Sequence, residues 1–410
     1  MTSASSHSMP WHRTVTAMIV AGCLVAIVNF GIRSTFGFFT VPISEAHEWP
    51  REIFSFAMAL HNLVWGLATP VAGMLADRYG SARVLMAGAV IYLIGLLMMA
   101  FTETPVMFNI GGGLLVGVGV AFSSFSIVMA ALGRIVPAER RSWAFGIATA
   151  SGSMGQFIFA PLGAVLISAY GWQTALVVLA ALSLLIIVFA WPLMSQNTSS
   201  APRSAGEADL TMRQAIGSAF GHGSYLLLIS GFFVCGFQLS FIVVHMPAYL
   251  TEHGISKEMA GIAMGLIGLF NVIGSYAAGI IGGRGDKHLP LAFIYLLRAM
   301  LVAGFVLLPV SNLTTLAFTV SMGLLWLSTV PFTMGLVTVM FGTRYMATLY
   351  GFVFVSHQVG SFLGVWLGGR LYDQYGSYDI VWWLSVALGV FAFLVHLPIR
   401  EQRAPRFAVA

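Results

Sequence analysis

Gly73-Met-Leu-Ala-Asp77-Arg78-Tyr-Gly80-Ser-Ala-Arg83 is the stretch that decides the fold of this chain. It is short, polar and charged, and a long apolar run flanks it on each side. Each run approaches the roughly 20 residues that a helix needs to cross a bilayer. The charges of the stretch belong in water, and its small residues let two helix ends approach closely. The pattern therefore predicts a turn at the membrane surface between two membrane-spanning helices.

The composition of the whole chain also predicts a membrane protein. Of its 410 residues, 58% are hydrophobic and 8% are charged, whereas a soluble domain carries about 25% charge. We therefore expect an all-α protein that crosses the membrane many times. The net charge of +5 would suit nucleic-acid binding, but the positions of the basic residues, described below, favour a role in topology. Cys23 and Cys235 lie inside apolar runs, so we expect no disulfide framework, metal site or cofactor.

Twelve apolar segments are long enough to be spans. The first is too long for the apolar region of a signal peptide, so we interpret it as a span. The segments lie at about 15–40, 53–73, 83–101, 106–131, 144–168, 173–194, 224–250, 259–282, 289–310, 313–339, 347–369 and 379–398.

A polar segment divides these spans into two sets of six. It contains Ser-Gln-Asn-Thr-Ser-Ser-Ala-Pro-Arg-Ser, a linker composition. Its later part, Leu210–Phe220, is a candidate amphipathic helix on the membrane surface. The predicted parts are a tail (1–14), an N-terminal six-helix bundle (15–194), a linker (195–223), a C-terminal six-helix bundle (224–398) and a second tail (399–410).

The two sets of spans carry traces of an internal repeat. Gly73 and Arg78 recur as Gly279 and Arg284, at an offset of 206 residues. Tyr170-Gly171 recurs 205 residues later. Two unrelated turn motifs that share almost one offset indicate a duplicated six-helix unit, an architecture of transporters whose substrate site lies between the halves.

Counting basic residues in the loops predicts the orientation in the membrane. An even number of spans places both termini on one side. That side holds fourteen of the nineteen basic residues, the other side holds three, and the remaining two lie within spans. We therefore expect both termini in the cytoplasm and the protein in a bacterial inner membrane. The fourteen residues are Arg13, Arg78, Arg83, Arg134, Arg140, Arg141, Arg203, Arg213, Arg284, Lys287, Arg344, Arg400, Arg403 and Arg406, and the three are Arg51, Lys257 and Arg370.

The opening stretch, Gly73-x-x-x-Asp77-Arg78-x-Gly80-x-x-Arg83, resembles the signature between spans two and three of the major facilitator superfamily. Together with the twelve spans, the central linker and the repeat, this resemblance covers the whole chain. It implies two pseudo-symmetric six-helix bundles that move a small solute by alternating access.

The resemblance also implies a cytoplasmic gate. In the superfamily, the Asp and Arg of the signature help to hold that gate shut by pairing with neighbouring helix ends. Carried over to this chain, Asp77 would bond Arg134 or Arg140. Gly279 and Arg284 would form the matching part in the second half. The alternative is that these charges only set the topology.

A narrower resemblance is to the monocarboxylate transporter family and its bacterial relatives, which include oxalate exchangers. The first span ends Asn29-Phe-Gly-Ile-Arg33-Ser-Thr-Phe-Gly-Phe-Phe, and Trp49-Pro-Arg51-Glu52 opens the second. The family's basic residue in the first span corresponds to Arg33. In its eighth span the family has an Asp and, four residues later, an Arg that binds the substrate carboxylate. This chain has Asn271 and Ser275 at those positions.

Nine residues inside the spans are candidates for substrate binding, because a charge at bilayer depth costs about 2.5–3.5 kcal/mol on insertion scales and polar groups there usually have a function. For Arg33 the alternative is that it reaches the membrane surface, and for Arg298 that it bonds backbone carbonyls. His357 is also a candidate for carrying a coupled proton. For the polar candidates other than the two arginines, the alternative to substrate binding is a hydrogen bond between helices. The nine are Arg33, His61, Asn62, Trp65, Gln156, Asn271, Arg298, His357 and Gln358.

These observations predict a secondary transporter and not an enzyme, since no HExxH, GxSxG or nucleotide-binding motif occurs. The expected substrate is a small carboxylate, moved by proton symport or anion exchange. Asn271 and Ser275 equally allow a neutral or aromatic solute, as in vitamin uptake or drug efflux. The alternative from another class is a membrane sensor that transports nothing. The expected partners are the solute, protons or a counter-anion, and the lipid bilayer, with the chain as a monomer and without nucleic acid.

Overall fold

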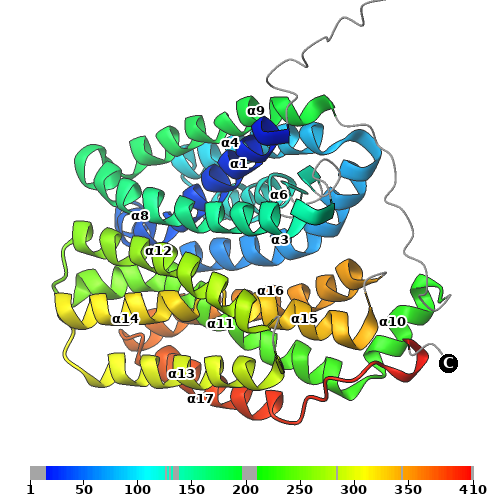
Figure 1. The fold of residues 1–410 in the computed structure, drawn as a ribbon. Coiled ribbons are helices and arrows are strands. Elements are labelled where there is room, and N and C mark those ends of the chain that lie inside the picture. Colours follow the sequence, from blue (N-terminus) through cyan, green and yellow to red (C-terminus); the bar gives the residue numbers. More distant parts are fainter. Residues whose placement is uncertain are drawn as a thin grey trace, which may run out of the picture.

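The computed structural model describes residues 15–124, 127–128, 131–132, 138–195, 210–282, 285–342 and 345–407. Within these ranges the chain forms helices and turns, without a strand. Figure 1 shows the helices of the N-terminal half, blue to green, lying against those of the C-terminal half, green to red. The expected all-α class with two groups of helices is thus confirmed.

The N-terminal half contains long helices with short interruptions. The first span is interrupted after Ser34, where the hydroxyls of Ser34 and Thr35 each donate to a backbone carbonyl three residues earlier, at 2.7 Å, a contact that bends helices. The elements of the N-terminal half are α1 (Val15–Ser34), the 3-10 helix η2 (Phe36–Phe39), α2 (Thr40–His47), α3 (Arg51–Tyr79), α4 (Ser81–Phe101), α5 (Pro105–Phe108), the π-helix η3 (Asn109–Leu115), α6 (Val116–Phe122), α8 (Ala138–Ser183), α9 (Leu185–Ala190) and the 3-10 helix η4 (Trp191–Ser195).

Eleven segments of the described chain are long and apolar enough to cross a membrane. One of them, Ile147–Met194, has 48 residues. It contains Gly171, whose φ of 80° and ψ of 164° are not helical. A side chain would strain this left-handed backbone, and glycine adopts it freely. We assign two spans to this segment, one on each side of Gly171, which gives the twelve that the sequence predicts.

The C-terminal half follows the same plan. The Leu210–Phe220 segment forms the expected short helix, and its start is held by a capping box between Thr211 and Gln214. The elements are α10 (Met212–Phe220), α11 (Gly223–Glu252), α12 (Lys257–Gly282), α13 (His288–Leu307), α14 (Asn312–Leu325), α15 (Thr329–Phe341), α16 (Met346–Tyr375), α17 (Asp379–His396) and the 3-10 helix η5 (Pro405–Phe407).

The tenth span differs from the single helix expected at 313–339. The helix α14 ends at Leu325 and α15 begins at Thr329. Pro331 lies just inside α15. In a continuous α-helix its ring would clash with the carbonyl of Leu327, four residues earlier. The proline therefore explains why the helix breaks between Leu325 and Thr329.

Helix packing reproduces the internal repeat. In the first half α1 packs against α8, and α3 against α6; in the second half α11 packs against α16, and α12 against α14. Each pair in the second half corresponds to a pair in the first half that lies about 206 residues earlier in the sequence. The two halves meet through two further pairs, α3 with α16 and α8 with α12, which are also related by that offset.

Glycines allow α11 and α16 to approach closely. A Cβ on Gly360 would lie 2.0 Å from the carbonyl oxygen of Phe233, and one on Gly236 would lie 1.8 Å from that of His357. Since both neighbours are backbone atoms, neither can move without shifting a whole helix.

Gly360→Ala is therefore expected to destabilise the protein by about 1–3 kcal/mol, the usual effect of overpacking. The measurement is thermal unfolding of the purified protein in detergent. Gly351→Ala is a matched control on the same helix, because nothing lies within 4 Å of its added Cβ. Equal melting temperatures for the two variants would contradict the close packing.

Candidate functional site

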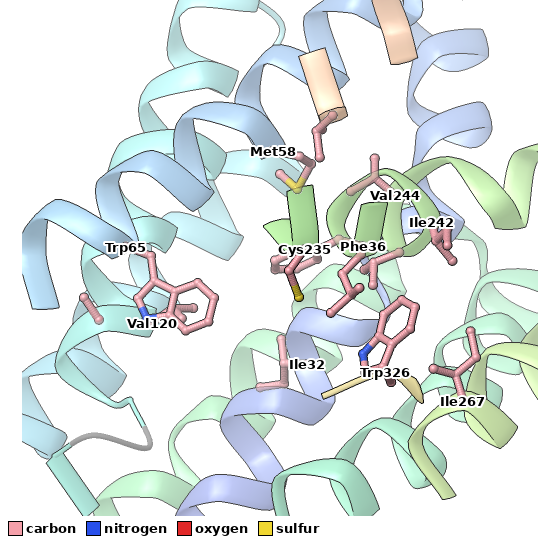
Figure 2. Close-up of a cluster of buried hydrophobic side chains, with 14 of the residues drawn as sticks. Ile32, Phe36, Met58, Trp65, Val120, Cys235, Ile242, Val244, Ile267 and Trp326 are labelled. Atoms are coloured by element: carbon pink, nitrogen blue, oxygen red, sulfur yellow. The ribbon is translucent and has the colours of Figure 1, made fainter. Parts of the chain in front are cut away.

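A small cavity lies where the two halves meet, between α1, η2, α3 and α11. Its volume is about 10 Å³, close to the space that one water molecule needs. Figure 2 shows the apolar side chains Ile32, Phe36, Met58 and Val244 gathered in this region. The lining residues are Arg33, Phe36, Met58, His61, Asn62, Ser240, Val243 and Val244.

Arg33 is the cation of this cavity. One guanidinium nitrogen, Nη2, donates to Asn62 Oδ1 at 3.0 Å, and the guanidinium lies 4.8 Å from the centre of the Trp65 ring. Asn62 is itself fixed by a 2.9 Å bond from its Nδ2 to the carbonyl of Met58. Within the described residues, no carboxylate forms an ion pair with Arg33. A guanidinium has five donor hydrogens, so this geometry holds the charge in place and leaves donors for a ligand.

His61 lies beside Arg33 on the same wall. Its side chain is 1% exposed, and neither ring nitrogen has a hydrogen-bond partner in the described part of the chain. The Phe36 ring meets the imidazole edge to face, at 5.7 Å between centroids. A polar group that is buried without a partner is uncommon in folded proteins, and it marks His61 as a group that a ligand could satisfy.

The C-terminal half contributes His357 and Gln358 at the same level. Gln358 Nε2 donates across the two halves to the carbonyl of Asn62 at 2.7 Å. His357 Nδ1 lies 2.9 Å from Gln358 Oε1. The Phe354 ring stacks on His357 and also meets Trp65 edge to face, at 5.4 Å. The structure thus brings together Arg33 and the five predicted residues named so far, His61, Asn62, Trp65, His357 and Gln358.

The remaining three predicted residues lie elsewhere. Arg298 is fully buried in α13, where it donates to the carbonyls of Leu325 and Trp326, the latter through a very short bond. Its Nη1 also lies 3.4 Å from Cys235 Sγ. Its guanidinium thus binds backbone groups that the break after α14 leaves without helical partners. This is the backbone alternative that the sequence left open for Arg298.

Asn271 and Gln156 link the two halves through amide hydrogen bonds. Asn271 Nδ2 donates to Ser153 Oγ at 2.8 Å, and its Oδ1 accepts from the Leu327 N–H and the Ser275 hydroxyl, each at 2.9 Å. Gln156 Nε2 donates to the carbonyl of Met264 at 3.1 Å. Both side chains are therefore engaged by the protein itself.

A cluster of charges joins the halves at the end of the molecule where α3 begins. Arg51 forms a very short ion pair with Glu252 of α11, and Arg370 Nη1 lies 2.9 Å from Glu52 Oε1. The Asp373 carboxylate accepts from the backbone N–H groups of Arg51 and Glu52, at 3.0 and 2.6 Å. This carboxylate thus caps the start of α3 from the other half, where a negative charge is favourable. The cluster thus holds the two halves together at this end.

Comparison with known proteins identifies the family of this chain. A sequence model of the Major Facilitator Superfamily matches residues 22–365. The chain belongs to this superfamily. It is therefore a multi-pass membrane transporter, and the alternative of a sensor finds no support in this match.

Curated relatives agree with the narrower resemblance. Monocarboxylate transporter 13 of Bos taurus is 27% identical over 371 residues, which cover 88% of this chain and 83% of that protein. Monocarboxylate transporter 11 of Homo sapiens is 24% identical over 383 residues, covering 90% and 80%. The MFS-type transporter YcxA of Bacillus subtilis (strain 168) is 23% identical over 397 residues, covering 92% and 93%. The predicted resemblance to monocarboxylate transporters is thus confirmed.

Solved structures confirm the major facilitator fold. The D-xylose-proton symporter superposes with a TM-score of 0.72 at 15% identity, covering 94% of this chain and 97% of that one. A bacterial homologue of the human lysosomal transporter Spinster, in an inward-facing and unoccupied conformation, gives a TM-score of 0.73 at 14% identity, covering 96% and 99%.

The superfamily signature forms the turn expected of it. Gly80 lies between α3 and α4 with a φ of 91°, and Arg83 Nη1 reaches the carbonyl of Tyr79 at 3.5 Å. Gly73 lies within α3, Gly279 lies within α12, and Arg78 is exposed. The side chains of Asp77 and Arg140, and all of Arg134 and Arg284, lie outside the described residues. The pairing of Asp77 with Arg134 or Arg140 stays a prediction.

Sequence reasoning did not identify the cavity residues of α11 or the charged cluster. Ser240, Val243 and Val244 belong to a helix that is apolar and largely buried on all sides, so its sequence shows no face that points to a site. Arg51 and Glu52 were visible as the start of a span, but their partners lie about 200 to 320 residues away. A single sequence carries no signal for such pairs.

Proposed function

We propose that this transporter moves a small carboxylate, with Arg33 as the ligand of the anion. The observation that carries the proposal is the guanidinium of Arg33, which lines the cavity between the halves and has no carboxylate partner among the described residues. A fixed, unpaired cation in a low-dielectric site attracts an anion strongly. The names of the curated relatives support the same substrate class.

The transport cycle would be alternating access between the two halves, by proton symport or anion exchange. We place both termini in the cytoplasm, as the basic loops favour. In that orientation the charged cluster of Arg51, Glu252 and Asp373 closes the outer end. The present cavity has room for about one water molecule, so the solute would enter when the halves separate. The cluster would then break and re-form once per cycle.

Uptake into proteoliposomes tests this function. Labelled lactate, pyruvate and oxalate are offered with the interior buffered at a higher pH than the medium, and protein-free liposomes serve as the control. We expect at least one acid to accumulate, and its unlabelled form to compete where the matching neutral amide does not. If no acid enters while neutral compounds do, the proposal is wrong.

A second candidate is a neutral or aromatic solute. It is favoured by the aromatic wall of Trp65 and Phe354 beside the cavity and by Asn271, whose amide is engaged within the protein where the related family has a charged pair. The same uptake assay with vitamins and drugs distinguishes it, since such transport would not depend on Arg33.

A further inference from the structure

Among the described residues that line the cavity, His61 is the one whose side-chain polar atoms are all buried without a partner. Leaving a buried donor or acceptor unsatisfied costs about 1–3 kcal/mol. His61 bears this cost at the boundary of the two halves, on the same cavity wall as Arg33. The next residue, Asn62, holds the guanidinium of Arg33. The imidazole is thus placed to share a ligand with that guanidinium.

The charges around His61 define how it can respond. From α1, Arg33 is the cation that interacts with it electrostatically. From α4, the phenol of Tyr92 lies within electrostatic reach of Arg33. From α11 the cavity receives only Ser240 and two valines, and from α16 the amide of Gln358 reaches the carbonyl of Asn62. The described residues place no carboxylate on this cavity.

Two positive charges this close repel each other unless an anion neutralises them. A carboxylate bound to Arg33 removes the repulsion and offers an acceptor for an imidazolium N–H. Anion and proton would then strengthen each other's binding by the same factor, as linkage requires.

We propose that His61 takes up the co-transported proton and becomes the second ligand of the carboxylate that Arg33 holds. This rests on the proposed function. A proton from water on one side bonds to an imidazole nitrogen as the anion binds, and it returns to water with the anion on the other side. One proton and one negative charge cross together, and His61 ends each cycle neutral.

His357, the other histidine at this level, has a different environment. Its Nδ1 lies 2.9 Å from Gln358 Oε1 and 3.5 Å from Ser361 Oγ. It does not line the cavity. The sequence suggested His357 as the proton acceptor. His61 is an alternative acceptor, because it lines the same cavity as Arg33 and, among the described residues, its two ring nitrogens form no hydrogen bond.

His61→Gln tests the proposal in proteoliposomes, in two assays. The first is accumulation of labelled carboxylate driven by a pH gradient, and the second is exchange of labelled for unlabelled carboxylate at equal pH. We expect the variant to lose accumulation and to keep exchange, with KM raised by about tenfold or more for one lost hydrogen bond to a charged group. His253→Gln, at an exposed position just after the end of α11, controls for loss of a histidine and is expected to accumulate normally.

The outcomes separate the two proposals. Accumulation by His61→Gln, or loss of accumulation in His357→Gln alone, would overturn the role of His61. Loss of exchange in a His61→Gln variant with an unchanged melting temperature would also overturn it, because exchange needs no net proton movement. Failure of the wild-type protein to bind any carboxylate would instead remove the proposed function.

A second measurement needs only the wild-type chain. Adding the transported carboxylate to purified protein in weak buffer should withdraw about one proton per site from solution, in keeping with one protonated group per bound anion. Binding without proton uptake between pH 6 and 8, the range in which histidine ordinarily titrates, would contradict the proposal.

Discussion

Arg33→Gln is expected to lower carboxylate uptake by about 10- to 100-fold. A hydrogen bond to a charged group contributes about 1.5–3 kcal/mol, and 1.4 kcal/mol corresponds to a tenfold change in binding. Glutamine is polar but uncharged and shorter than arginine, so the substitution removes both the charge and the 3.0 Å bond to Asn62. The measurement is the initial rate of labelled uptake in proteoliposomes over a range of substrate concentrations.

Two further variants sharpen this result. Arg33→Lys keeps the charge but loses the planar fork that matches a carboxylate, so its uptake should fall between those of the wild type and Arg33→Gln. Arg213→Gln removes an exposed arginine from the surface helix α10 and should leave uptake unchanged. Normal uptake by Arg33→Gln would remove Arg33 from the site.

Arg298→Leu is expected to destabilise the protein by about 2–6 kcal/mol, since one buried and one part-buried carbonyl would each lose a charged donor at about 1–3 kcal/mol apiece. Those carbonyls belong to Leu325 and Trp326, at the break between α14 and α15. The measurement is thermal unfolding in detergent, together with uptake per folded molecule. Arg298→Lys keeps one donor group and should lose less stability.

A structural role and a substrate-binding role of Arg298 predict different results for these variants. A role at the helix break predicts a lower melting temperature with KM nearly unchanged in whatever protein remains folded. A role in substrate binding predicts a normal melting temperature with a raised KM, and that outcome would contradict the structural role.

The sequence was sufficient to predict the class of fold, because the signals for it are local. Apolar runs of membrane length, the stretch from Gly73 to Arg83 and the paired Tyr-Gly turns each need only a few neighbouring residues. Gly171 and Gly376 indeed adopt positive φ, at 80° and 69°. The break in the tenth span also has a local signal, Pro331, but apolar length alone hides it.

The candidate site was predictable only in part. Polarity within the spans selected Arg33, His61 and Asn62, which the structure places on one cavity, but it selected Arg298 equally. What separates them is the helix that each side chain faces. His61 meets the empty space beside α11, whereas Arg298 meets carbonyls of a broken helix. That difference arises from tertiary packing between distant segments, which a single sequence does not encode visibly.

The most direct test of the central claim is binding of an acid and its neutral amide to the purified protein. Lactate and lactamide have nearly the same shape and differ in charge, so ligand-induced stabilisation reports whether the site recognises the anion. For wild-type protein and Arg33→Gln, each compound is titrated at pH 6 while the melting temperature is recorded, with pyruvate and pyruvamide as a second pair. We predict that an acid of this panel, and not its amide, raises the melting temperature of the wild type, and that Arg33→Gln loses this response. Equal stabilisation of both proteins, or stabilisation by the amide as well as by the acid, would contradict an anion site at Arg33.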